Sequence, residues 1–109
     1  MVDKLHKLRS MLLIIIIPIL FSCASAEYYD NRGLDYYFKG QYDQAISDYT
    51  KALEINPRFA EAYNNRGIAY FEKREYDKSS EDVKKALDLG YQVHPKVFEE
   101  LRKASGRQN

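Results

Sequence analysis

The chain has 109 residues, with 17 Lys and Arg against 16 Asp and Glu and a single cysteine. This length accommodates one small domain, and one cysteine excludes an internal disulfide framework and any zinc site built from several cysteines. A net charge of +1 without a Lys/Arg stripe argues against nucleic-acid binding. Two histidines leave little material for catalysis or metal binding. The composition therefore favours a protein that is not an enzyme and needs no metal or cofactor.

Residues 1–26 differ in composition from the rest of the chain. A basic start at 4–9 precedes an apolar run at 11–21, and small residues fill positions 22–26. This order is typical of a bacterial-type secretory signal. A bilayer-spanning helix needs about 20 apolar residues, whereas this run is shorter and contains Pro18. We expect export, with an uncleaved N-terminal membrane anchor as the alternative.

Two processing sites compete at the end of this segment. The sequence LFSC at 20–23 resembles the lipobox of bacterial lipoproteins, in which the cysteine is lipidated and becomes the mature N-terminus. This resemblance implies that residues 1–22 are the signal, that Cys23 carries the lipid, and that the protein is tethered to a membrane of the bacterial cell envelope. Cleavage after Ala26 would instead release a soluble periplasmic or secreted protein.

The rest of the chain contains an internal repeat, with one copy at 26–59 and a second at 60–93. When the two copies are placed one above the other, many identical side chains align. The clearest matches are Tyr29 with Tyr63, Asn31 with Asn65, Arg32 with Arg66, Gly33 with Gly67, Tyr36 with Tyr70, Asp43 with Asp77, Asp48 with Asp82 and Ala52 with Ala86.

Within each copy, the spacing of aromatic and small residues predicts a pair of packed helices. Tyr29, Gly33 and Tyr36, like their counterparts in the second copy, share one helical face because they are four and three residues apart. We expect the glycine to let the second helix approach closely, with the tyrosines in the core. Small residues on the second helix, at Ala45 and Ala52, would allow the same close crossing.

Turn and breaker residues divide the repeats into helices. Residues 39–41 and 73–75 separate the two helices of each copy, and Asn56-Pro57 ends the first copy. Gly90 provides the stop after the second copy. A last helix is predicted to begin at Pro95, with one apolar side that covers the exposed end of the second repeat.

A 34-residue period with these aromatic and small positions resembles the tetratricopeptide repeat. The resemblance implies an all-α fold, a short superhelix of two helix-turn-helix repeats at 26–59 and 60–93. A capping helix at 94–104 and a flexible tail at 105–109 complete the prediction. Three or more repeats are usual for stability, so two repeats and a cap need a partner or self-association.

Three recurring polar positions have no obvious role in the pattern. Arg32 and Arg66 stand where the family usually has leucine. Asp48 and Asp82 recur with the repeat, as does Asp43 with its counterpart. We expect these aspartates to be solvated helix positions or partners of nearby lysines rather than an acid–base pair.

In tetratricopeptide proteins the first helix of each repeat lines a concave groove. The resemblance therefore implies a candidate site, called the binding face below, that consists of Asp30, Asn31, Leu34, Tyr37, Asn64, Asn65, Ile68 and Phe71. The two equivalent asparagines of this set, Asn31 and Asn65, resemble the peptide-gripping ladder of O-linked N-acetylglucosamine transferases. Capping or solvation of the helix is the alternative role for them.

One well-known ligand of the family is not expected. Chaperone-type carboxylate clamps need lysine where this chain has Asp30 and Asn64, and asparagine where it has Leu34 and Ile68. Recognition of an acidic C-terminal tail is therefore disfavoured.

Together these observations predict a non-catalytic protein–protein interaction module, exported and tethered to a membrane through its N-terminal signal or lipid. We expect an extended peptide or a helix of a partner protein to bury Leu34, Tyr37, Ile68 and Phe71. The alternative function is a structural unit that dimerises or stacks through its repeats, with a second copy of the chain as its partner.

Overall fold

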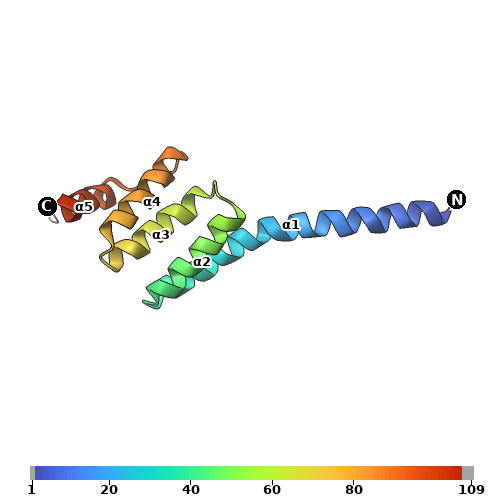
Figure 1. The fold of residues 1–109 in the computed structure, drawn as a ribbon, viewed down its shortest axis with the longest axis horizontal. Coiled ribbons are helices and arrows are strands. Elements are labelled where there is room, and N and C mark those ends of the chain that lie inside the picture. The colour runs from blue at the N-terminus through green and yellow to red at the C-terminus, as the bar shows by residue number, and fades with distance from the viewer. Residues whose placement is uncertain (1, 107–109) are drawn as a thin grey trace.

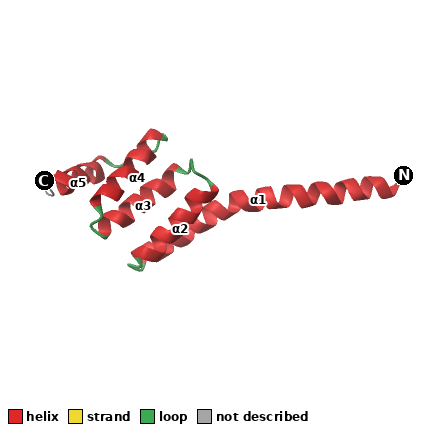
Figure 2. Cartoon of the chain, viewed as in Figure 1, coloured by secondary structure: helices red, strands yellow, loops and turns green. Residues whose placement is uncertain are grey.

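The computed structural model describes residues 2–106, which form five α-helices and no strand (Figure 1, Figure 2). The helices are α1 (Val2–Phe38), α2 (Tyr42–Ile55), α3 (Ala60–Glu72), α4 (Tyr76–Asp88) and α5 (Pro95–Gly106). The predicted all-α class is confirmed. Side chains at 2–3, 5 and 12–25 lie outside the description, as do residues 1 and 107–109. The side chain of the expected lipidation residue, Cys23, and the last three residues of the predicted tail therefore fall outside it.

The helices stack as two antiparallel hairpins followed by a single helix. α1 packs against α2, α3 against α4, α2 against α3, and α5 against α4. Figure 1 shows the N-terminal part of α1 projecting from this stack as an isolated rod. α1 runs without a break through residues 22–26, where the sequence contains no helix-breaking residue. In the described residues, no helix has an apolar stretch long enough to cross a bilayer.

Three of the helices end in the same hydrogen-bonded turn. The backbone N–H of Gln41 donates to the carbonyl of Tyr36 at 2.9 Å, and Glu75 and Tyr91 make the equivalent bonds to the carbonyls five residues before them. This turn needs a residue in the left-handed region. Gly40 (φ 74°) and Arg74 (φ 62°) occupy equivalent positions in the two repeats, so the second repeat adopts the turn without glycine.

The two helices of each hairpin approach most closely at the repeated glycine. A Cβ atom added to Gly33 would lie 2.7 Å from Cε1 of Tyr49, and one added to Gly67 would lie 3.1 Å from Cγ2 of Val83. Tyr49 is completely buried, together with Ala45 and Ala69. The prediction that the missing side chains permit close packing is confirmed.

The repeated tyrosines lie at the edge of the core rather than inside it. Tyr29 and Tyr63 are half-buried and pack against the buried cluster around Ala52 and Ala62. Tyr36 packs in the same way beside Ala45 and Tyr49. The prediction that these tyrosines are packing residues is confirmed for Tyr29, Tyr36 and Tyr63. The rings of Tyr29 and Tyr63 also lie beside the guanidinium groups of Arg32 and Arg66.

Candidate functional site

A bidentate ion pair repeats in the two hairpins and joins the first helix of each to the second. The Nε and Nη2 atoms of Arg32 donate to the carboxylate of Asp48 at 2.6 and 2.7 Å. The same atoms of Arg66 donate to Asp82 at 2.7 and 2.8 Å. Both carboxylates are buried, which corrects the expectation that they are solvated. The arginine partners lie 16 residues earlier, on the adjacent helix. Pairing rules for residues three or four apart within one helix therefore could not predict these contacts.

Each arginine also lies beside the repeated aromatic rings. The guanidinium of Arg32 is 5.2 Å from the ring centroid of Tyr29, and that of Arg66 is 5.7 Å from the ring centroid of Tyr63. Hydrogen bonding to Asp82 raises the pKa of Arg66 above its usual value, against the opposing effect of burial. The arginine thus replaces the family's leucine with a planar cation that bonds a buried carboxylate and stacks beside aromatic rings. In the sequence, the signal for this ion pair was the recurrence of both the arginine and the aspartate in the two copies of the repeat.

The predicted binding face lies on α1 and α3, with its members at different depths. Asn31 is exposed. Five side chains are half-buried: Leu34, Tyr37, Asn65, Ile68 and Phe71. The remaining two, Asp30 and Asn64, are buried.

Two polar contacts connect α1 with α3 on this face. Nδ2 of Asn65 donates to the Asp30 carboxylate, 3.3 Å from Oδ1 and 3.5 Å from Oδ2. The hydroxyl of Tyr37 donates to Oε1 of Glu72 at 3.4 Å. Burial raises the pKa of Asp30; the hydrogen bond from Asn65 lowers it, and the charge of Glu61 raises it further. The face therefore keeps a buried acid whose bonded partner is a neutral amide.

This burial gives a pH-dependent prediction. Folding raises the pKa of Asp30 above its value in the unfolded chain, so the folded chain binds the proton of this carboxyl more tightly. The contribution of Asp30 to stability therefore falls as pH rises from the unfolded pKa through the folded pKa. Asp30→Asn is expected to increase the free energy of unfolding at neutral pH. The gain should shrink as the solution is acidified, because Asp30 itself then becomes neutral. Urea unfolding at a series of pH values measures it.

The matched control is Asp35→Asn, which changes an exposed aspartate on the same helix. It is expected to leave the pH dependence as it is in the unaltered chain. A gain for Asp30→Asn that stays the same at every pH would contradict the role of the Asp30 charge.

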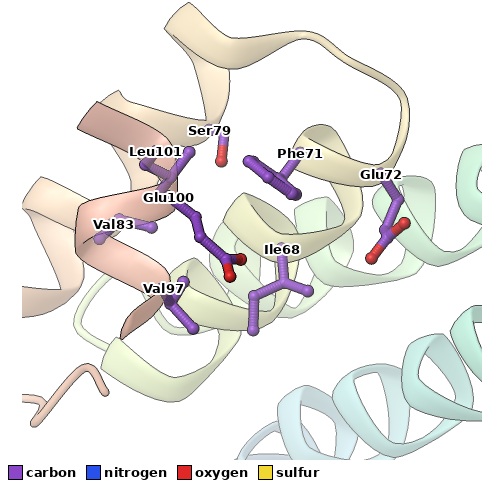
Figure 3. A pocket seen from close by; sticks show the side chains of 8 residues that line it. All are labelled: Ile68, Phe71, Glu72, Ser79, Val83, Val97, Glu100 and Leu101. Carbon is purple, nitrogen blue, oxygen red and sulfur yellow. The ribbon is translucent and has the colours of Figure 1, made fainter. Parts of the chain in front are cut away.

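A cavity of about 120 Å³ lies between α3, α4 and α5 (Figure 3). Its lining consists of Ile68, Phe71, Glu72, Ser79, Val83, Val97, Glu100 and Leu101. It therefore extends the binding face beyond the repeats onto α5. The sequence prediction contained two of these residues, Ile68 and Phe71, and assigned the apolar side of α5 only to capping. It missed Glu100, for which the repeat pattern offers no equivalent position.

Two family models match the chain. One described as TPR repeat covers residues 33–74, and one described as Tetratricopeptide repeat covers residues 60–89. No curated protein matches the sequence.

Solved structures of tetratricopeptide domains resemble the fold. The Arabidopsis OM64 TPR domain is 26% identical with a TM-score of 0.62, over 63% of this chain and 57% of that one. The first TPR of Spaghetti (RPAP3), bound to the HSP90 peptide SRMEEVD, is 30% identical with a TM-score of 0.60, over 62% and 55%. The N-terminal domain of stress-induced protein-1 from C. elegans is 26% identical with a TM-score of 0.60, over 63% and 54%.

The chain spans a little over half the length of these solved domains. The two family matches overlap and together extend from residue 33 to residue 89. They include the glycine contacts at Gly33 and Gly67 and the ion pair of Arg66 with Asp82, whereas Arg32 lies one residue before the first match. Residues 33–89 of this chain therefore match the tetratricopeptide repeat in sequence and in fold.

Proposed function

We propose that this chain is a non-catalytic protein-binding module that holds an extended peptide or a helix of a partner against α1 and α3. The observation that carries the proposal is the row of half-buried apolar side chains Leu34, Tyr37, Ile68 and Phe71. The last two also line the cavity between α3, α4 and α5. Apolar side chains beside polar ones suit a polypeptide ligand. The peptide-bound RPAP3 domain, with a similar fold, supports this proposal.

The two equivalent asparagines would fix the position of the ligand backbone. Asn31 is exposed, and the hydrogen bond to Asp30 orients the amide of Asn65. A side-chain amide can donate to a peptide carbonyl and accept from a peptide N–H. With apolar side chains of the ligand buried beside them, these two amides would set the register of an extended chain.

The test is selection of ligands from a displayed library of random peptides on the full chain. Asn31→Ala combined with Asn65→Ala is expected to weaken a selected peptide by more than tenfold, about 1.4 kcal/mol or above, because both backbone contacts are lost. Titration calorimetry measures this affinity, and thermal unfolding of the variant shows whether loss of the Asp30 contact has altered the fold.

Gln44→Ala is the matched control, because it removes an exposed amide on α2, outside the binding face. It should leave the affinity unchanged. If the double variant binds as tightly as the control, the asparagines do not contact the ligand. A library that yields no ligand would contradict the binding function itself.

We further propose that the module is exported and tethered to a membrane of the bacterial cell envelope through a lipid on Cys23. The basic start, the apolar run and the LFSC segment that ends at this cysteine support this location. The intact mass of the mature protein tests it, and a diacylated N-terminal cysteine is the expected result. A mature chain that begins at Glu27 would instead indicate soluble release, and a retained signal would indicate an anchor.

A second candidate function is self-assembly, favoured by an unpartnered apolar groove between α4 and α5. Leu87 and Phe98 are 40% and 50% exposed there, and both line a cavity of about 470 Å³. A helix from a second copy could occupy this groove and extend the stack. Sedimentation equilibrium distinguishes the two functions, since a concentration-dependent dimer supports assembly and a stable monomer supports the binding module.

A further inference from the structure

We propose that the partner segment is cationic as well as apolar. One aliphatic side chain would enter the cavity between α3, α4 and α5, and a neighbouring Lys or Arg would pair with Glu72 and Glu100 at its rim. This inference rests on the proposed binding function and adds the chemistry of the partner to it.

The cavity is suited to a single apolar side chain. The buried side chains of Val83 and Leu101 form part of its wall, and the half-buried Ile68, Phe71 and Val97 complete the apolar lining. An engineered apolar cavity of about 150 Å³ holds benzene. The present volume of about 120 Å³ therefore admits an aliphatic side chain and not a large indole.

Two carboxylates flank this apolar cavity. Figure 3 shows Glu100 extending from α5 toward Ile68, while Glu72 extends from the end of α3 on the other side of Ile68. Both residues are exposed, and the hydroxyl of Tyr37 bonds Glu72. Among the described residues that line the cavity, none is Lys or Arg. A ligand cation would thus meet two carboxylates next to the apolar site.

The negative charge continues along the face toward α1. Asp30 is buried with Asn65 as its bonded partner, and the charge of Glu61 is close enough to raise the pKa of Asp30. An acidic ligand would therefore meet carboxylates at both ends of the face, whereas a basic ligand would be attracted there. The charge of the face is therefore opposite to what an acidic peptide such as SRMEEVD, the ligand of the similar RPAP3 domain, would need.

The arrangement favours a polypeptide over a simple metal ion. Within the residues that the structure describes, no group of three or more His, Cys, Asp or Glu side chains could hold a metal. The carboxylates of Glu72 and Glu100 instead border a cavity whose lining is mostly apolar, which suits an apolar side chain. A segment with alternating aliphatic and basic residues satisfies both features at once.

The experiment uses synthetic peptides that share a central leucine pair and differ only in their flanking residues, which are lysine, serine or glutamate. The full chain is expected to bind the lysine-flanked peptide at least tenfold more tightly than the serine-flanked one, and the glutamate-flanked one least. The advantage of lysine should decrease as sodium chloride is added, because salt screens exposed charges. Fluorescence anisotropy measures the three affinities.

Glu72→Gln combined with Glu100→Gln is expected to remove that advantage, a loss of about tenfold for the lysine-flanked peptide, and to leave the serine-flanked peptide unchanged. Glu54→Gln combined with Glu81→Gln is the control. It makes the same change in net charge at exposed positions on α2 and α4, so both affinities should stay as they are.

Each other outcome overturns the inference. Equal binding of the three peptides would remove the charge preference and leave the protein-binding function intact. If none of the three binds while the random library still yields ligands, the cavity is not the docking site. If neither yields a ligand, the binding function fails as well. A dimer of the chain that excludes the lysine-flanked peptide would assign the face to a second copy.

Discussion

Asp82→Asn is expected to lower the free energy of unfolding by about 3 kcal/mol, because it leaves the guanidinium of Arg66 without its anionic partner. The side chains of Asp82 and Arg66 are 6% and 19% exposed, and Oδ2 of Asp82 lies 2.7 Å from Nε of Arg66. Water cannot replace the lost carboxylate at this depth, and an amide can accept from the guanidinium but carries no charge. Urea unfolding followed by circular dichroism measures the loss.

The equivalent substitution in the first repeat provides an internal comparison. Asp48→Asn should cost less, because the side chain of Arg32 is 40% exposed and can be hydrated after the pair is broken. Asp77→Asn, at an exposed position in the first turn of the same helix, should cost about 1 kcal/mol at most, from the lost interaction with the helix dipole. A loss for Asp82→Asn no larger than that of Asp77→Asn would contradict the role of the buried pair.

A double substitution that removes both charges distinguishes the stabilisation by the ion pair from the free-energy cost of burying the two charges. Replacing a buried pair with apolar residues is often neutral, whereas removing one partner leaves a buried charge. Arg66→Leu combined with Asp82→Leu is therefore expected to be less destabilising than Asp82→Asn alone. Leucine at position 66 would also restore the residue that is usual in the family.

Gly33→Ala is expected to lower the free energy of unfolding by about 2 kcal/mol, although alanine favours a helix by about 1 kcal/mol over glycine. The added methyl group would lie 2.7 Å from Cε1 of Tyr49 and 3.2 Å from the carbonyl oxygen of Ala45. The tyrosine ring is completely buried, so the two helices must separate to accept the atom, which costs about 1–3 kcal/mol or more. Thermal and urea unfolding measure the net effect.

The second repeat supplies a graded control for this contact. Gly67→Ala should cost less, because its methyl group would lie 3.1 Å from a methyl group of Val83, and Val83 is the counterpart of Tyr49. Gly33→Ala should likewise cost less when it is measured in a Tyr49→Val background, as a double-mutant cycle would show. Equal losses in both backgrounds would mean that the tyrosine ring is not what resists the methyl group.

The repeating helical hairpins follow from residue spacing alone. Tyr29, Gly33 and Tyr36 recur in the second copy of the repeat, and their spacing selects one helical face because a helix places such residues on one side. The glycine and the breaker at Asn56-Pro57 then indicate where helices cross and where they end. These are local properties of the chain, which explains why the helices and their pairing could be predicted without coordinates.

Which polar side chains meet, and where the cavity lies, depends on how the helices pack against one another. Asp48 bonds a residue 16 positions away, Asn65 bonds Asp30 35 positions away, and Glu100 reaches the cavity from α5. These contacts depend on how far apart the packed helices lie and at what angle they cross, and residue spacing within one helix specifies neither quantity. For that reason the sequence could indicate the binding face but not the acidic rim of its cavity.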